Sequence, residues 1–220
     1  MLEVLYEDNH LIAINKKSGD IVQGDKTGDA PLSDFVKAYI KKKYNKPGEV
    51  FLGTIHRLDR PTSGVVLYAR TSKALARMNE QFRNKEVQKT YWAVVDNSPP
   101  NTSGTLDNFL QKNEKQNKSF VTKNKEGKQA ILDYKLLKQL DNFYHLEIKP
   151  KTGRHHQIRV QLANIGCIVK GDLKYGAKRS NKDASIHLLA QKIEFVHPVT
   201  KEPISIIVPA PKNSIWGACK

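Results

Sequence analysis

Short runs of apolar and β-branched residues, separated by turns, recur along this chain and outnumber the segments with helical spacing. These runs predict strands at residues 4–6, 11–14, 64–69, 89–95, 120–121, 130–140, 143–148, 188–190, 193–196 and 204–208. Helical spacing predicts helices over 32–44, after a cap at Thr71 or Ser72, and after Arg154 with a stop at Gly166. The elements do not alternate as βαβ units do. We therefore expect an α+β fold, with a mixed, mostly antiparallel sheet and flanking helices.

Two polar stretches interrupt this pattern. Residues 96–104 are rich in Asn, Ser, Pro and Gly and predict a loop. Residues 111–128 carry six lysines against two glutamates, so we expect exposed hairpin ends there, with a solvated surface as the default and RNA contact as the alternative. No internal repeat occurs, and a chain of 220 residues can bury a core of its own. We expect one domain over residues 1–220.

The charge balance favours a polyanionic partner. Lys and Arg number 37 and Asp and Glu 22, which leaves a formal net charge of +15. Nucleic acid is the ordinary partner of such a surface, because its phosphates bind Lys and Arg and release counterions. A membrane surface is the weaker alternative, since no long basic amphipathic helix is evident. The remaining alternative is charge that serves solubility alone.

The cysteines and the first residues of the chain indicate in which cellular compartment we expect the protein. Cys167 and Cys219 lie far apart and form no Cys-x-x-Cys pair, which suggests a reducing environment without disulfides. The first residues lack a basic region followed by an apolar run, and about eighteen apolar residues never occur together. These features predict a cytoplasmic protein with no membrane partner.

The sequence lacks the common signatures of cofactor sites. Its seven histidines never form His-Glu-x-x-His or a Cys/His ligand pattern. Neither a Gly-x-x-x-x-Gly-Lys-Ser/Thr loop nor a Gly-x-Gly-x-x-Gly run is present. We expect no metal, no nucleotide and no other cofactor.

One stretch concentrates reactive side chains. Residues 56–64 read HRLDRPTSG and lead into the apolar run 65–69. Asp59 lies between Arg57 and Arg60, ahead of a Pro-Thr-Ser-Gly turn that would hold it on stiff backbone. Because neighbouring positive charge favours the ionised form of a carboxylic acid, this pattern predicts a nucleophile or an electrostatic stabiliser. The alternative is an ordinary turn with solvated arginines.

This stretch, with Thr62, Ser63 and Gly64 at its end, resembles the signature of the RluA family of RNA pseudouridine synthases. Four further blocks that are similar to this family follow in order: residues 89–95 (KTYWAVV), 153–160 (GRHHQIRV), 171–176 (GDLKYG) and 197–198 (HP). With the opening residues 4–11 (VLYEDNHL), the resemblance extends from about Val4 to Pro209. The chain resembles the short members of this family, which lack an S4 domain.

The resemblance implies the pseudouridine synthase fold, with a catalytic cleft across the sheet, and the isomerisation of RNA uridines to pseudouridine. Asp59 is then the nucleophile on a flipped-out uridine, at either C6 of the base or the anomeric carbon. Tyr91 stacks on the target base; the alternative is ordinary aromatic packing in a half-buried strand. Arg159 forms an ion pair with Asp59.

The resemblance also implies substrate-binding residues. Arg57 fills the space that the flipped base leaves. The others share the same two motifs: His56, Thr62, Gly64, Arg154 and Gln157. The expected partner is rRNA, tRNA or both, and the expected state is a monomer. Which RNA and which uridine are modified stays open.

Three positions depart from the usual family pattern. Lys17 stands where proline is usual, which predicts a less rigid loop, and His155 and Gln161 replace a threonine and a histidine. These departures and the charge suggest an alternative, a non-catalytic RNA-binding or ribosome-assembly module that retains the fold. The presence of Asp59, Tyr91 and Arg159 together favours the enzyme, since a binding module does not need all three.

Overall fold

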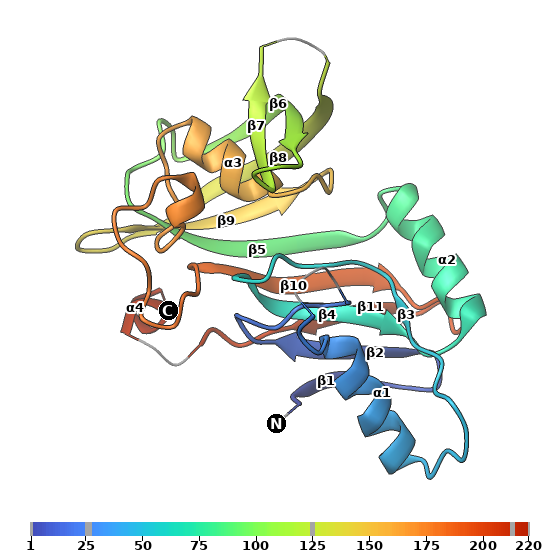
Figure 1. Cartoon of the computed structure of the whole chain (residues 1–220). Helices are drawn as coiled ribbons and strands as arrows, with labels where there is room; N and C mark the ends of the chain where they lie inside the picture. Colours follow the sequence, from blue (N-terminus) through green and yellow to red (C-terminus); the bar gives the residue numbers. More distant parts are fainter. Residues whose placement is uncertain (1, 25–27, 124–125, 212–213, 220) are drawn as a thin grey trace. The chain divides into compact units, whose positions relative to one another are not determined.

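The computed structural model describes residues 2–24, 28–123, 126–211 and 214–219 (Figure 1). The chain divides into two compact units. Unit 1 comprises residues 1–88 and 190–208, and unit 2 comprises residues 89–189 and 209–220. That residues 1–220 form one domain stays a prediction.

Unit 1 is built on strands whose central members are buried on both faces. Its strands are β1 (Val4–Glu7), β2 (Leu11–Lys16), β3 (Gly53–Thr54), β4 (Ser63–Ala69), β11 (Pro203–Ile207) and most of β10 (Leu188–Val196). They follow the order β1-β2-β4-β10, with β3 paired to β4 and β11 to β10. The pairings β1–β2, β2–β4, β3–β4 and β10–β11 are antiparallel. Double-sided burial explains why β2 and β4 read as continuous apolar runs rather than as alternating ones.

The described part of unit 1 contains two helices, both near their predicted positions. Helix α1 (Leu32–Lys43) buries Leu32, Val36 and Ile40. Phe35 is apolar and shares the helical spacing of this segment, but it is 57% exposed. Helix α2 (Ser72–Arg83) begins at the predicted cap, where the Thr71 hydroxyl accepts a hydrogen bond from the backbone N–H of Ala74 at 3.2 Å.

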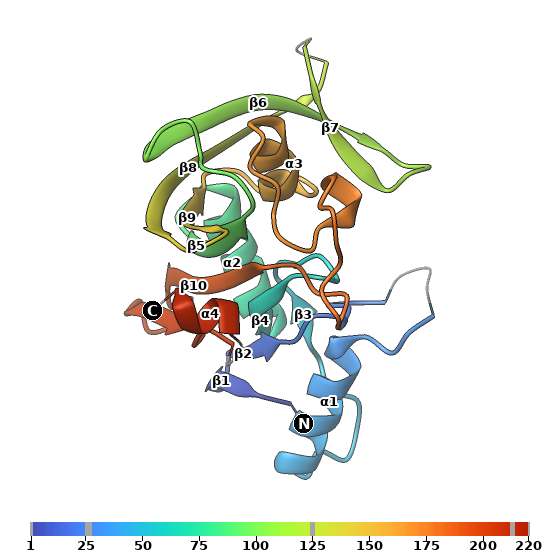
Figure 2. The ribbon, with the colours of Figure 1, turned by 90° about the vertical axis from the view of Figure 1, so that its left-hand side faces the viewer.

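Unit 2 is an antiparallel meander that holds a short helix. Its strands are β5 (Gln88–Val95), β6 (Ser103–Asn113), β7 (Lys118–Thr122), β8 (Lys128–Gln139) and β9 (Tyr144–Pro150), in the order β5-β9-β8-β6-β7. All four pairings are antiparallel. Helix α3 (Gln157–Asn164) lies beside these strands in Figures 1 and 2. Its Ile158 and Leu162 belong to the same hydrophobic core as Leu132 and Leu146. A 3₁₀ turn, η1 (Leu173–Tyr175), and helix α4 (Ser214–Ala218) complete the unit.

Strand β6 corrects two expectations. The predicted loop over residues 96–104 ends earlier, because β6 already begins at Ser103. The polar residues at 111–113, expected in a hairpin end, continue this strand and pair with β7. Lys125, one of the six lysines of that segment, lies outside the described residues. Gly104 fits here because the Tyr134 hydroxyl would lie 3.0 Å from a Cβ at this position.

The elements confirm the predicted α+β class, with a mostly antiparallel arrangement and few helices. Among the helices that the structure describes, none is long and apolar enough to cross a membrane.

Candidate functional site

The stretch that carries Asp59 forms a tight turn between β3 and β4 in unit 1. The backbone N–H of Thr62 donates to the carbonyl of Asp59 at 3.0 Å, and the Asp59 side chain is half-buried. His56 anchors the approach to this turn. Its Nε2 accepts a hydrogen bond from the backbone N–H of Leu67 at 3.1 Å, and its ring stacks on Phe82 with centroids 5.4 Å apart.

Lys16, at the end of β2, holds the other side of the turn. Its side chain is fully buried, and its Nζ donates to the carbonyl oxygens of Lys17 and Arg60, each at 3.0 Å, and of Thr62 at 2.7 Å. Gly19 adds a hydrogen bond from its N–H to the carbonyl of Arg60 at 2.9 Å. The loop that lacks the usual proline at position 17 is therefore tied to the Asp59 turn through backbone acceptors.

Burial lowers the pKa of Lys16 to about 8, although the carboxylates of Asp20 and Asp59 act in the opposite direction. Near neutral pH the lysine still carries its proton, so it provides both the hydrogen bonds and a positive charge beneath the turn.

The other residues predicted from this stretch differ in their surroundings. Arg57 is exposed, and Arg60 pairs with Asp29 at 2.7 Å. The Thr62 hydroxyl is buried, and no hydrogen-bond partner occurs for it among the described residues. Gly64 has a φ of +121°, and a Cβ there would lie 2.3 Å from the carbonyl oxygen of Ala190. Glycine at this position is thus required by the close approach of β4 and β10.

In unit 2, Arg159 and Asp172 form a buried bidentate ion pair. Nε of Arg159 donates to Oδ2 of Asp172 and Nη2 donates to Oδ1, both at 2.7 Å. The side chains are only 4% and 1% exposed. This fork-to-fork geometry fixes the plane of the guanidinium. The Tyr175 ring supports it, since Cζ of Arg159 lies 5.1 Å from the ring centroid.

The hydroxyl of Tyr175 ties α3 to the β7 strand. It lies 3.0 Å from Nδ1 of His156 and accepts a hydrogen bond from the backbone N–H of Ser119 at 3.0 Å. Burial, followed by the positive charge of Arg159, lowers the pKa of His156 to about 2. A neutral imidazole therefore lies beside the buried arginine near neutral pH.

Gln157 and Arg154 brace the loop before α3. Oε1 of Gln157 accepts from the Thr152 hydroxyl at 2.7 Å and from the backbone N–H of Arg154 at 3.0 Å, and Nε2 donates to the carbonyl of Ile131 at 3.0 Å. The Arg154 side chain is exposed and donates to the carbonyl of Gln129 at 2.8 Å. Gln157, 4% exposed, thus organises the loop, while Arg154 lies at the surface.

Two residues in this region depart from the usual family pattern, and they differ in burial and in hydrogen-bond partners. Gln161 is fully buried, and its Nε2 donates to the carbonyl of Ala130 at 3.0 Å and to Oδ1 of Asn108 at 2.9 Å. It therefore joins α3 to β6 and β8. His155 is half-buried, with its Nδ1 2.9 Å from the Ser119 hydroxyl.

Tyr91 is half-buried on β5, opposite Ile148 of β9, and packs against the core of unit 2. This environment is compatible with both of our expectations for it, a base platform and a packed aromatic in a strand. The predicted ion pair of Asp59 with Arg159 stays a prediction.

Sequence reasoning missed the roles of Asp172 and Lys16. Both lie in motifs that we had identified, Asp172 in GDLKYG and Lys16 in the loop with the missing proline. The signal in the sequence was an acidic residue directly after Gly171. In the structure Gly171 has a φ of +87°, and a Cβ at this position would lie 2.7 Å from the carbonyl oxygen of Ser185. A charged residue in such a compressed loop needs a partner when it is buried.

These arrangements can hold a carboxylate on a rigid turn in unit 1 and a fixed, permanently charged guanidinium in unit 2. Among the residues that the structure describes, no group of three or more His, Cys, Asp or Glu side chains could hold a metal ion.

Comparison with known proteins identifies related sequences. A family model described as RNA pseudouridylate synthase matches residues 10–164, a range that contains Asp59, Tyr91 and Arg159. Ribosomal large subunit pseudouridine synthase C of Buchnera aphidicola subsp. Schizaphis graminum (strain Sg) is 37% identical over 214 residues, covering 94% of this chain and 66% of that protein. The tRNA pseudouridine synthase C of Vibrio vulnificus (strain CMCP6) is 32% identical over 235 residues, covering 98% of this chain and 93% of that protein.

A solved structure gives the same result at the level of the fold. The human RNA Pseudouridylate Synthase Domain Containing 4 matches with a TM-score of 0.80 and 23% identity, covering 99% of this chain and 91% of that one. This confirms the predicted pseudouridine synthase fold. The chain spans 66% of the length of the Buchnera aphidicola relative.

Proposed function

We propose that this chain, which belongs to the RNA pseudouridylate synthase family, isomerises uridines in RNA to pseudouridine. The observation that carries the proposal is the family match over residues 10–164, because that range holds the whole Asp59 turn, Tyr91 and Arg159. The net charge of +15 supports a polyanionic substrate.

The reaction exchanges a glycosidic C–N bond for a C–C bond without redox change, so the proposal needs no cofactor. The Asp59 carboxylate attacks the flipped-out uridine at C6 of the base or at the anomeric carbon. The detached base turns, is joined again through C5, and then loses its C5 proton to a base. Anchoring of the turn by His56 and Lys16 supports this role, because a nucleophile must be held in near-attack geometry.

Arg159 and Tyr91 complete the proposed machinery. Arg159 forms an ion pair with Asp59 and orients it, and Asp172 in turn fixes the Arg159 guanidinium through two hydrogen bonds of 2.7 Å. Tyr91 stacks on the base and retains it while it turns. The half-buried position of Tyr91 supports this role, since its ring is held by the unit 2 core.

Substrate-binding roles divide by exposure. Arg57 and Arg154 are exposed and can contact RNA directly, and Arg57 fills the space vacated by the flipped base. The remaining residues shape the backbone around the site: His56, Thr62, Gly64 and Gln157.

The names of the relatives suggest the substrate class. One relative is named a ribosomal large subunit pseudouridine synthase and another a tRNA pseudouridine synthase. We propose that the substrate is rRNA, tRNA or both, and that the protein acts as a monomer in the cytoplasm. Size-exclusion chromatography with light scattering tests the monomer.

Release of tritium from RNA labelled at C5 of uridine tests the function, because re-attachment through C5 expels the proton at that position. Purified protein should release tritium from rRNA or tRNA transcripts and leave pseudouridine at defined positions. Mapping of pseudouridines in total RNA from cells with and without this gene then identifies the target. Tight RNA binding without any tritium release would contradict the proposal and support a non-catalytic binding module.

A further inference from the structure

A hollow of about 310 Å³ opens in unit 1, where the end of α1, the segment before β3 and the end of β4 meet. Its lining includes Tyr44 and Lys46 after α1, Phe51 before β3 and Arg70 after β4. Ile40, which is only 2% exposed, also lines it. None of these residues belongs to the proposed catalytic machinery. We call this hollow the α1 pocket.

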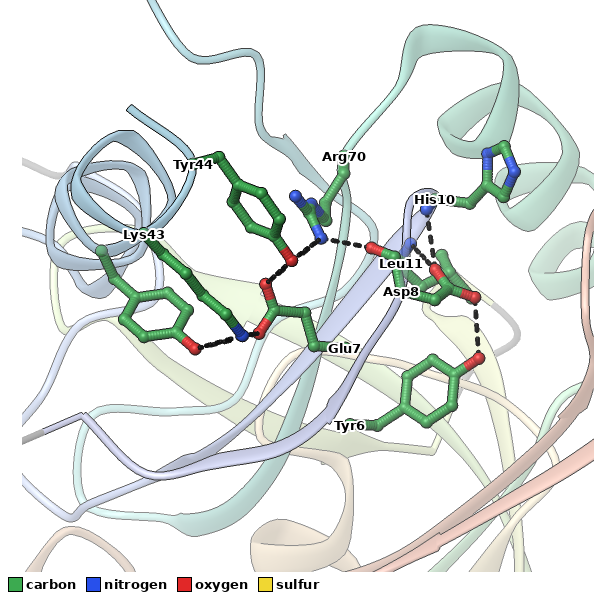
Figure 3. A network of polar contacts seen from close by, with 9 residues as sticks. Tyr6, Glu7, Asp8, His10, Leu11, Lys43, Tyr44 and Arg70 are labelled. Carbon is green, nitrogen blue, oxygen red and sulfur yellow. Dashed lines mark hydrogen bonds and ion pairs between the residues drawn. The ribbon is translucent and has the colours of Figure 1, made fainter. Parts of the chain in front are cut away.

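Glu7, at the end of β1, is hydrogen-bonded to Tyr44 and Arg70, two residues that line the α1 pocket, and Figure 3 shows this polar network. Its carboxylate accepts hydrogen bonds from Nζ of Lys43 at 2.7 Å, from the Tyr44 hydroxyl at 2.8 Å and from Nη1 of Arg70 at 3.2 Å. Nη1 of Arg70 also donates to the carbonyl of Asp8. The guanidinium lies over the Tyr44 ring, with Cζ 4.5 Å from the centroid.

The network around Glu7 is ionic. Burial alone would raise the pKa of Glu7, but hydrogen bonds from Lys43, Tyr44 and Tyr39 outweigh burial and hold the pKa below its ordinary value. An ionised Glu7 balances only one of its two cationic partners, Lys43 and Arg70. Positive charge therefore remains beside the pocket.

Lys46 lines the α1 pocket, and Lys41 and Lys42 follow the lining residue Ile40 in the last turn of α1. Lys41, Lys42 and Lys46 are exposed, and Glu49 is the acidic residue in the lining. Cations in the last turn of a helix complement its dipole, which accounts for Lys41 and Lys42. It does not account for Lys46, which follows the end of α1. Two cations, Lys46 and Arg70, line the pocket, and the last turn of α1 adds Lys41, Lys42 and Lys43, against the carboxylates of Glu7 and Glu49.

Aromatic side chains are exposed at the same place. Tyr44 is 41% exposed and Phe51 is 47% exposed, although large apolar side chains usually gain free energy from burial. One face of the Tyr44 ring already carries the Arg70 guanidinium, which leaves Phe51 as the accessible stacking surface. An exposed aromatic ring among lysines is the combination with which proteins bind single-stranded nucleic acid.

We propose that the α1 pocket binds a single-stranded segment of the RNA substrate, outside the target uridine. One base stacks on Phe51, and the adjoining phosphates lie against Lys41, Lys42 and Lys46. A cavity of this volume is at the small end for ligand sites and suits one planar base. The inference rests on the proposed function only in taking RNA as the polyanion.

A binding experiment separates this surface from the catalytic residues. The probe is a labelled oligouridylate of about 20 nucleotides, titrated by fluorescence anisotropy at several salt concentrations. Phe51→Ala tests stacking, and the triple variant Lys41→Gln/Lys42→Gln/Lys46→Gln tests the phosphate contacts. The matched control removes three exposed charges elsewhere in unit 1, in Arg83→Gln/Lys85→Gln/Lys201→Gln.

Phe51→Ala should weaken binding by roughly tenfold and leave the salt dependence unchanged, because stacking releases no counterions. The Lys41/Lys42/Lys46 triple variant should reduce the slope of log K against log salt by about 2, at about 0.7 for each single-strand phosphate lost. Equal losses in this triple and in the Arg83/Lys85/Lys201 control would overturn the inference, because they would show that only overall charge matters.

Crosslinking gives a second, independent result. An oligouridylate that contains 4-thiouridine, irradiated with the wild-type protein, should crosslink to the peptide that contains Phe51. Its absence from the crosslinked peptides would overturn the inference. Crosslinking at Phe51 by a protein that releases no tritium from labelled RNA would instead contradict the proposed function and leave this inference standing.

Discussion

The Asp172 carboxylate accepts two hydrogen bonds of 2.7 Å from the Arg159 guanidinium, and both side chains are almost completely buried. The pair lies across the start of α3 and the turn η1, with the Tyr175 ring beneath the guanidinium. A buried arginine that is held along one edge presents its remaining N–H groups in a fixed direction. This relationship makes Asp172 the residue that positions the cation which we propose to orient Asp59.

Asp172→Asn should therefore lower both stability and activity. The substitution removes the carboxylate charge that faces the buried Arg159 guanidinium, and breaking a buried ion pair in this way costs about 3 to 5 kcal/mol in the free energy of unfolding. Urea denaturation measures the stability and tritium release measures the activity. Asp141→Asn, at an exposed turn position, is the control and should change neither.

The double variant Arg159→Met/Asp172→Leu separates folding from chemistry. Apolar side chains of similar volume in place of a buried ion pair are often neutral or stabilising. Stability should return to near that of the wild type while tritium release stays absent. A stable double variant that still modifies RNA would contradict the role of the pair in positioning Asp59.

Lys16→Met tests the anchor of the Asp59 turn. The carbonyl oxygens of Lys17, Arg60 and Thr62 lose their common donor, which should cost about 2 to 4 kcal/mol of stability. Because Lys16 is fully buried, kcat should fall while KM for RNA changes little. Lys17→Met, at the exposed neighbouring position, should behave like the wild type. A rise in KM with unchanged kcat in Lys16→Met would place Lys16 in RNA binding and contradict its role as an anchor.

Acid should destabilise the protein through buried histidines. Burial lowers the pKa of His145 and of His187 to about 4 in the folded state, from an ordinary value of 6.5. Between these values the unfolded chain binds the protons first, so the free energy of unfolding falls as the pH drops from 6.5 towards 4. Each histidine contributes at most about 1.4 kcal/mol per pH unit in this window.

His145→Leu should remove one histidine's share of that slope. The measurement is the urea midpoint at several pH values between 4 and 7, followed by tryptophan fluorescence, because the ring centroids of Trp92 and Trp216 lie 5.0 Å and 6.2 Å from that of His145. An unchanged pH slope in this variant would show that His145 is already protonated in the folded protein.

Tyr91→Phe and Tyr91→Ala test the proposed base platform. A phenyl ring retains stacking, so Tyr91→Phe should keep RNA affinity, and turnover should fall about 100-fold or more if the hydroxyl takes part in proton removal. Tyr91→Ala should lose both. Single-turnover tritium release and RNA binding measure the two effects, and unchanged kinetics in Tyr91→Phe would restrict Tyr91 to packing.

Local signals predicted the elements that depend on local chemistry. The Thr71 cap and the stop at Gly166 follow from rules that act within one or two helical turns. Strand β6 was missed because its polar residues hide the alternation, and its stability comes from pairing with β7 and β8.

The same reasoning explains which parts of the site were predicted. Asp59 was identified by its motif and by resemblance. The partnership of Asp172 with Arg159 was not, because it joins α3 to a loop whose path depends on the compressed backbone at Gly171. Burial of Gln157 and Gln161 likewise follows from how α3 packs on β6 and β8.

The central claim is that the carboxylate of Asp59 is the nucleophile. Asp59→Asn keeps the size and the polarity of the side chain, so this variant should fold and bind RNA with wild-type affinity. The direct measurement is tritium release from uridine-labelled RNA by this variant in single turnover. The account predicts none above background, and measurable release at any substantial fraction of the wild-type rate would contradict it.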